Sequence, residues 1–137
     1  MAVKRWKAGG RRMTRMTEPL QVLYVEDNTD VRELIVMLLE DEGLTVVDCA
    51  SAELAEAEFA GRRFDVLITD VSLPTMQGTE LASRLRQQRS DLWVVFCSGY
   101  AMQQGLLSWG PRARALLKPF EADELHALMQ EIRAARP

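Results

Sequence analysis

The feature that most constrains this chain is a regular alternation, from Leu20 onward, of short apolar runs with longer amphipathic stretches. Such an alternation is typical of β–α–β units, in which parallel strands form one sheet and the connecting helices cover its two faces. Strands buried on both faces are short and almost continuously apolar, as these runs are. The sequence therefore predicts an α/β fold with an open, doubly wound sheet of five parallel strands. The predicted strands are residues 20–25, 45–49, 64–69, 92–97 and 113–117.

The stretches between these runs repeat their apolar residues at helical spacing. In the first stretch, Gly43 follows the apolar residues as a stop signal, so one helix is predicted before it. Its apolar positions are Val31, Leu34, Ile35, Leu38 and Leu39. Further helices are predicted at 52–60, 79–88 and 122–135, the last with an apolar stripe at Leu125, Leu128, Met129 and Ile132.

The stretch before the last strand, residues 101–112, breaks the helical pattern. It contains Gly105, Gly110 and Pro111, which disfavour a continuous helix. We therefore predict a short or irregular fourth helix there. Trp109 lies in the same stretch, and we expect either a core position or an exposed ring that marks a partner face.

The length of 137 residues suits one domain with one sizeable core, predicted at 20–137. Residues 1–19 carry six Lys and Arg but one acid, and they lack apolar periodicity. They predict a mobile basic arm, which is either foreign to the native protein or a partner-binding segment around Trp6. The remaining residues carry eleven bases and nineteen acids, an acidic balance that argues against direct nucleic-acid binding.

Apolar runs do not exceed six residues, so we expect no membrane span and no membrane partner. The N-terminus lacks the apolar core of a secretory signal, and the expected location is therefore the cytoplasm. Cys49 and Cys97 are 48 positions apart and belong to no cluster of metal-ligand residues. They are interpreted as small buried apolar residues rather than as a disulfide or a metal pair.

Polar residues follow four of the five predicted strands. Glu26 and Asp27 follow the first strand, and Asp70, Ser98 and Lys118 follow the third, fourth and fifth. In a doubly wound sheet, ligands bind in the crevice outside the carboxyl ends of the strands. We therefore expect these side chains to meet in one crevice.

Each of these residues has a simpler interpretation when it is taken alone. An acidic pair at a strand end is usually the solvated start of a helix, and Ser98 or Lys118 alone would be a turn or loop residue. Together, however, three converging carboxylates call for a hard divalent cation such as Mg²⁺. Asp70 can act as a nucleophile toward a phosphoryl group, while Ser98 and Lys118 suit its oxygens. The combination indicates a phosphoryl-transfer site.

The pattern resembles the receiver domain of two-component response regulators, the CheY-like superfamily. The resemblance covers residues 20–137 and rests on four motifs with spacings of 43, 28 and 20 residues. These are Glu26-Asp27, Asp70 followed by LPTMQG at 73–78, Ser98-Gly99 and Lys118-Pro119-Phe120. It implies a flavodoxin-like (βα)5 fold with strand order 2-1-3-4-5.

The resemblance also implies roles for individual residues. Asp70 would be the phosphoacceptor, served by a sensor histidine kinase or a histidine phosphotransfer protein. Glu26, Asp27, Asp70 and the backbone carbonyl of Ser72 would bind Mg²⁺. Ser98 and Lys118 would contact the phosphoryl group, and the peptide bond before Pro119 would be cis.

Two positions depart from the family pattern or modify it. Receivers often have Tyr or Phe three residues before the lysine, where this chain has Ala115, so the usual aromatic response to phosphorylation is in doubt. Tyr100 is at a position where the family tunes the access of water and hence the lifetime of the acyl phosphate. The chain could therefore be phosphorylated as in the family and still signal the phosphorylation differently.

The sequence thus predicts a single-domain response regulator that signals by protein contact through the face from strand 4 to the last helix, with a homodimer as one option. It would not be an enzyme beyond its own phosphoryl transfer and dephosphorylation. The alternative is a pseudo-receiver that binds proteins without phosphorylation. A haloacid-dehalogenase-type enzyme is disfavoured because Ser72 replaces its second Asp, and His126 is interpreted as a solvent-edge residue rather than a phosphodonor.

Overall fold

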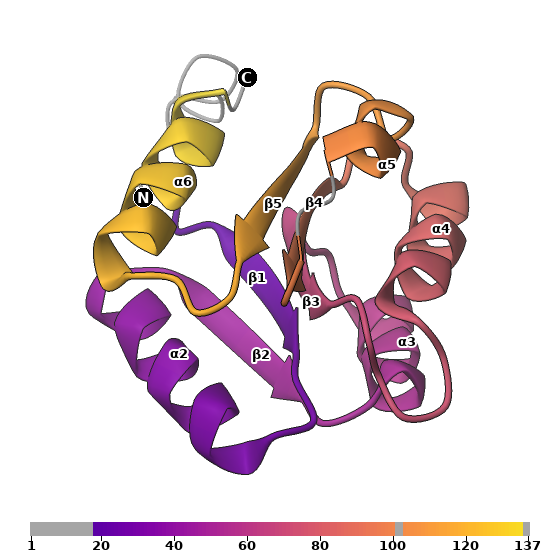
Figure 1. Cartoon of the computed structure of the whole chain (residues 1–137), viewed down its shortest axis with the longest axis horizontal. Helices are drawn as coiled ribbons and strands as arrows, with labels where there is room; N and C mark the ends of the chain where they lie inside the picture. Colours follow the sequence, from indigo (N-terminus) through magenta and orange to yellow (C-terminus); the bar gives the residue numbers. More distant parts are fainter. Residues whose placement is uncertain (1–17, 101–102, 136–137) are drawn as a thin grey trace, which may run out of the picture.

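The computed structural model describes residues 18–100 and 103–135 and contains one parallel sheet with helices on both sides (Figure 1). Its five strands are ordered β2-β1-β3-β4-β5, which confirms the predicted fold class and strand order. The strands are β1 (Gln21–Val25), β2 (Thr45–Cys49), β3 (Val66–Asp70), β4 (Trp93–Ser98) and β5 (Ala113–Leu117). The helices are α2 (Thr29–Asp41), α3 (Ala52–Gly61), α4 (Gly78–Gln88), α5 (Gln103–Leu107) and α6 (Ala122–Ala134).

The sheet separates two apolar cores. Helices α3, α4 and α5 lie on one face, whereas α2 and α6 lie on the other (Figure 1). Successive residues of β1 alternate between them, with Leu23 in the first core and Tyr24 in the second. The three central strands, β1, β3 and β4, are covered on both faces and are almost continuously apolar, whereas the edge strands β2 and β5 each contain an internal charged residue.

Local signals set the helix ends. The Asn28 side chain caps α2 by accepting a 3.0 Å hydrogen bond from the Val31 N–H, and Ser51 caps α3 in the same way at Leu54. Gly43, with a φ of +82°, follows α2 in the left-handed conformation that glycine adopts without strain. The predicted stop at Gly43 is confirmed.

The buried face of α2 is narrower than its apolar pattern predicts. Ile35 and Leu39 are buried, but Leu34 is 55% exposed and Val31 is 37% exposed. Helix α2 packs beside β2, an edge strand, so fewer of its residues face the sheet. On α6 the predicted stripe at 125, 128, 129 and 132 is buried throughout.

Two strand boundaries differ from the prediction in a way that concerns the polar residues. β3 begins at Val66 rather than residue 64 and ends with Asp70, and β4 ends with Ser98. Asp70 pairs with Cys97 in the sheet, so its backbone belongs to the ladder rather than to the following loop. The fourth helix is short as predicted, because α5 has five residues.

Of the two alternatives for Trp109, the structure supports the core position rather than the exposed ring. The ring is half-buried and packs edge-to-face on Phe96 of β4, with 5.0 Å between ring centroids. The guanidinium of Arg86 lies over the Trp109 ring, 5.6 Å from the ring centre. Trp109 therefore joins α5 to the sheet.

Three further predictions concern the N-terminal arm, the cysteines and membrane spans. Trp6 and most of the predicted arm, residues 1–17, lie outside the described residues. Both cysteines are buried and without a disulfide, as expected of small apolar residues. Within 18–100 and 103–135, the helices are too short or too polar to cross a membrane.

Candidate functional site

Three carboxylates meet at the carboxyl ends of β1 and β3. Glu26 and Asp27 follow β1, Asp70 ends β3, and the two strands are neighbours in the sheet. One oxygen of each carboxylate lies within 4.8 Å of the others. Glu26 and Asp70 are 3% and 7% exposed, whereas Asp27 is exposed. The structure therefore brings together the three predicted acidic residues.

Lys118 enters the same cluster from the end of β5. Its Nζ atom lies 2.5 Å from Asp70 Oδ1 and 3.2 Å from Glu26 Oε1. One ammonium beside three carboxylates leaves an excess of negative charge, and all the carboxylate ligands are hard oxygens. This donor set fits a divalent cation of the Mg²⁺ or Ca²⁺ type, held by Glu26, Asp27 and Asp70.

The charged form of Asp70 is disfavoured by its surroundings. Burial raises the pKa of Asp70 to about 6, Lys118 opposes the rise, and the Glu26 carboxylate adds to it. The pKa of Lys118 is also raised: burial lowers it, but the contacts with Asp70 and Glu26 prevail. Lys118 therefore remains a fixed cation next to Asp70.

Ser98 ends β4 and is 4% exposed. Its hydroxyl accepts a 3.1 Å hydrogen bond from the Tyr100 N–H, and its carbonyl accepts one from the Lys118 N–H at 2.7 Å. These two bonds connect the end of β4 to Lys118 after β5 and to the backbone of Tyr100. Tyr100 is 63% exposed. Position 115 on β5 is occupied by an exposed alanine, where many receivers have an aromatic residue.

Gly78 is a site residue whose structural role is not evident from the sequence. Gly78 is the first residue of α4, and its N–H donates a 2.7 Å hydrogen bond to the carbonyl of Val71, which follows β3. A Cβ atom at this position would lie 1.8 Å from the carbonyl oxygen of Asp70. Only glycine lets α4 begin this close to the Asp70 backbone. The available signal was a glycine directly before the helix predicted at 79–88.

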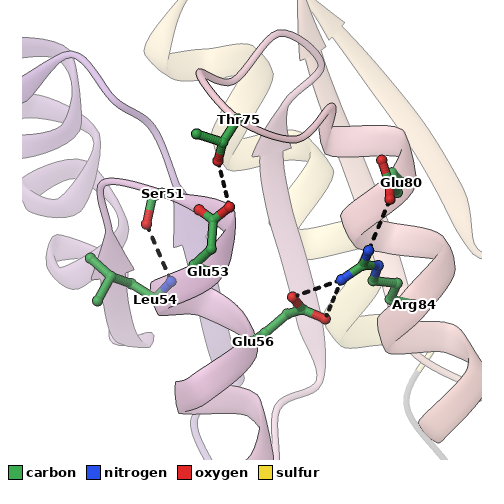
Figure 2. Close-up of polar contacts among 7 residues, drawn as sticks. All are labelled: Ser51, Glu53, Leu54, Glu56, Thr75, Glu80 and Arg84. Carbon is green, nitrogen blue, oxygen red and sulfur yellow. Dashed lines mark hydrogen bonds and ion pairs between the residues drawn. The ribbon is translucent and has the colours of Figure 1, made fainter.

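The loop between β3 and α4 is attached to α3 at Thr75 (Figure 2). The Thr75 hydroxyl donates a 2.5 Å hydrogen bond to Glu53 Oε2, and this bond lowers the pKa of Glu53. The same view shows Arg84 of α4 bridging Glu56 of α3 and Glu80. Ser72 lies on this loop and is exposed, and the role of its carbonyl as a metal ligand stays a prediction.

Two smaller predictions agree with the structure. The peptide bond between Lys118 and Pro119 is cis. The His126 side chain is 55% exposed at the edge of α6, where its Nδ1 atom lies 3.0 Å from Glu42 Oε1.

Comparison with known proteins identifies the family of this chain. The model of the response regulator receiver domain matches residues 22–130. The response regulator receiver protein CpdR of Brucella abortus is 34% identical over 107 residues, which cover 77% of this chain and 89% of CpdR. A part of the sensor kinase CckA of the same organism is 34% identical over 115 residues, which cover 81% of this chain and 12% of the kinase.

Solved structures share the fold. The response regulator TrrA of Thermotoga maritima, in complex with Mg²⁺ and BeF, has a TM-score of 0.74 and 26% identity over 82% of this chain and 98% of TrrA. Chemotaxis protein CheY4 of Vibrio cholerae has a TM-score of 0.76 and 28% identity over 83% of this chain and 98% of CheY4. By contrast, the match spans about half of some larger relatives, such as 47% of the transcriptional regulatory protein TcrA of Mycobacterium tuberculosis. With its acidic cluster at the strand ends and the family model matched over most of its length, the chain belongs to the response regulator receiver domains of two-component systems.

Proposed function

We propose that the protein is a phosphoacceptor receiver in a two-component phosphorelay, with Asp70 as the acceptor. The observation that carries this proposal is the contact of Lys118 Nζ with Asp70 Oδ1 at 2.5 Å inside a cluster of three carboxylates. An oxygen of Asp70 would bond to phosphorus as the bond between phosphorus and a donor histidine nitrogen breaks, and the freed imidazole would keep its electron pair. The donor class is a sensor histidine kinase or a histidine phosphotransfer protein.

Each residue of the site has a role in this reaction. Glu26, Asp27, Asp70 and the Ser72 carbonyl would hold Mg²⁺, which neutralises charge on the transferring phosphoryl oxygens. Lys118 is already in place as a fixed cation for the same charge. The Ser98 hydroxyl would leave its contact with the Tyr100 N–H and donate to a phosphoryl oxygen, and Tyr100 would set the access of water. The protein would catalyse only its own phosphorylation and dephosphorylation.

The output would pass through protein contact. Phosphorylation adds about −1.5 to −2 charge at Asp70, which changes the balance around Lys118 and Ser98. The surface from β4 through α5 and β5 to α6 exposes Leu107 by 84% and Leu117 by 53%, in addition to Tyr100. We propose this surface for a downstream protein or for a second copy of the chain.

A pseudo-receiver that binds proteins without phosphorylation is the second candidate. It is favoured by Ala115, because a small side chain at this position on β5 cannot act as the aromatic reporter common in the family. The two candidates differ in whether Asp70 accepts a phosphoryl group.

The test is the intact mass of the protein after incubation with acetyl phosphate and Mg²⁺. A gain of one phosphoryl group that needs the metal and is absent in Asp70→Asn supports the acceptor function. Asp91→Asn is the matched control, because Asp91 is an exposed carboxylate that pairs with Arg89 on the turn before β4. If the wild-type mass does not change under any condition, the pseudo-receiver function replaces the first proposal.

A further inference from the structure

Arg32 connects the acidic segment after β1 to the edge strand of the sheet. Its side chain, in the first turn of α2, is 16% exposed. Nη1 donates a 2.8 Å hydrogen bond to the backbone carbonyl of Glu26, and Nε donates a 3.1 Å bond to Asp48 Oδ2 on β2. One planar guanidinium thus holds two partners in fixed directions, which a single ammonium cannot do.

The other polar atoms of Glu26 are also held. Its N–H donates to the Cys49 carbonyl at 3.0 Å, its Oε2 accepts from the Asn28 N–H at 3.1 Å, and its Oε1 meets Lys118 Nζ at 3.2 Å. The backbone carbonyl of Glu26 lies where the chain leaves β1 toward Asp27, and the Arg32 guanidinium donates a hydrogen bond to this carbonyl. Arg32 itself carries no group that can bind a cation.

We propose that Arg32 is a positioning residue for the metal site, which raises the affinity for a divalent cation by fixing the backbone that carries the Glu26 and Asp27 carboxylates. The proposal rests on the proposed function, because it assumes that these carboxylates bind a cation. Groups that hold metal ligands in place typically contribute 10- to 100-fold to metal affinity. Arg32 acts on the backbone of a ligand rather than on its carboxylate, so we expect an effect of about tenfold, at the lower end.

The sign of the effect separates positioning from simple electrostatics. Arg32 is a cation beside an acidic site, so by charge alone its removal would strengthen the binding of another cation. If the guanidinium positions the Glu26–Asp27 segment, its removal weakens the binding instead. The two explanations therefore predict changes in opposite directions.

The experiment measures binding of Mn²⁺ to the full chain by the EPR signal of the free ion, with Mg²⁺ as a competitor. Arg32→Met keeps much of the length of the side chain but removes its charge and its donors. Arg84→Met is the matched control, because it makes the same change where the guanidinium joins Glu56 and Glu80 on α3 and α4 (Figure 2). We expect the Mn²⁺ and Mg²⁺ dissociation constants to rise about tenfold in Arg32→Met and to stay at the wild-type values in Arg84→Met.

A kinetic measurement distinguishes a positioning role from general damage to the fold. In Arg32→Met, the Mg²⁺ concentration for half-maximal phosphorylation by acetyl phosphate should rise about tenfold, while the rate at saturating Mg²⁺ should stay within about twofold of wild type. Should Arg32→Met fail to fold, Arg32→Lys retains the charge but cannot bridge Asp48 and the Glu26 carbonyl in the same way. It should bind Mn²⁺ severalfold more weakly than wild type.

The outcomes are distinct for the two proposals. If wild type binds neither Mn²⁺ nor Mg²⁺, the proposed metal site is wrong and the role of Arg32 is wrong with it. If wild type binds the metal ions and Arg32→Met binds them equally or more tightly, the proposed metal site is supported and the positioning role of Arg32 is overturned. Wild-type affinity in Arg32→Lys would also overturn it.

Discussion

At the scale of single residues, Asp70 combines burial with charge. Its carboxylate is 7% exposed at the end of a buried strand, close to a second carboxylate and one ammonium. Burial and Glu26 prevail over Lys118, which places the pKa of Asp70 at about 6 instead of 3.8. The folded protein without metal therefore binds a proton at Asp70 more readily than the unfolded chain does, and the charged form is the one that lowers stability.

This pKa predicts a pH-dependent effect of Asp70→Asn on stability in EDTA. Between about pH 4 and pH 6 the folded state holds the proton and the unfolded state loses it, so Asp70 lowers the free energy of unfolding as the pH rises. At pH 7, Asp70→Asn should be more stable than wild type by about 3 kcal/mol. Denaturant titrations should show this difference shrinking toward pH 4, whereas Asp91→Asn should stay within about 0.5 kcal/mol at both pH values.

Gly78 predicts a second effect at this scale. In Gly78→Ala the added Cβ would lie 1.8 Å from the Asp70 carbonyl oxygen. The Cβ position is fixed by the backbone of residue 78 and the oxygen is itself a backbone atom, so neither can turn aside. The free energy of unfolding should fall by about 3 kcal/mol, the upper part of the range for overpacking. Gly61→Ala is the control, because a Cβ at Gly61 meets nothing within 4 Å. Equal stability of both variants in urea denaturation would contradict this account of the α4 start.

At the scale of secondary-structure elements, α5 depends on side chains beyond its own five residues. Trp109 packs on Phe96 of β4, and Arg86 of α4 donates hydrogen bonds to the backbone carbonyls of Trp109 and Arg112 at 2.5 and 2.6 Å. A helix of one to two turns is not stable in isolation, so these contacts keep α5 on the sheet. Helix α6, by contrast, buries a full apolar stripe of its own.

This dependence predicts that Trp109→Ala releases α5 locally. The half-buried ring should contribute about 2 kcal/mol, less than a fully buried tryptophan. Hydrogen exchange at residues 105–110 should become faster, while the amides of α2 and α6 on the opposite face keep their protection. Leu107→Ala serves as the control, because the Leu107 side chain is 84% exposed. The same acceleration in Leu107→Ala would show that α5 is not held by Trp109.

At the scale of the whole molecule, the sheet separates its apolar cores, which lie on its faces, from the carboxylates at the carboxyl ends of its strands. Two apolar cores cover the faces of the sheet, and the excess of carboxylates collects at its carboxyl edge. A cation that binds there binds only the folded chain, since its carboxylates come from two segments far apart in the sequence, residues 26–27 and Asp70. The stability of the whole domain should therefore respond to metal.

Mg²⁺ is predicted to raise the free energy of unfolding by about 1.4 kcal/mol when its free concentration is ten times its dissociation constant. Thermal unfolding of wild type in Mg²⁺ and in EDTA measures this difference. Asp27→Asn should lose most of the gain, because it removes one of the three carboxylates. Asp123→Asn, an exposed carboxylate in the first turn of α6, is the control and should keep the gain.

The fold class could be predicted from sequence patterns, because apolar runs and helical spacing are local features that report burial on both faces of a parallel sheet. The sequence also located Glu26, Asp27, Asp70, Ser98 and Lys118, because residues after parallel strands must share one edge. Tertiary structure alone decided the contacts between segments far apart in sequence. The guanidinium of Arg32 at the Glu26 carbonyl, the close approach of Gly78 to Asp70, and the burial of Trp109 against Phe96 are of this kind. Periodicity shows that a residue is buried or exposed, but its contact partners depend on how the elements pack.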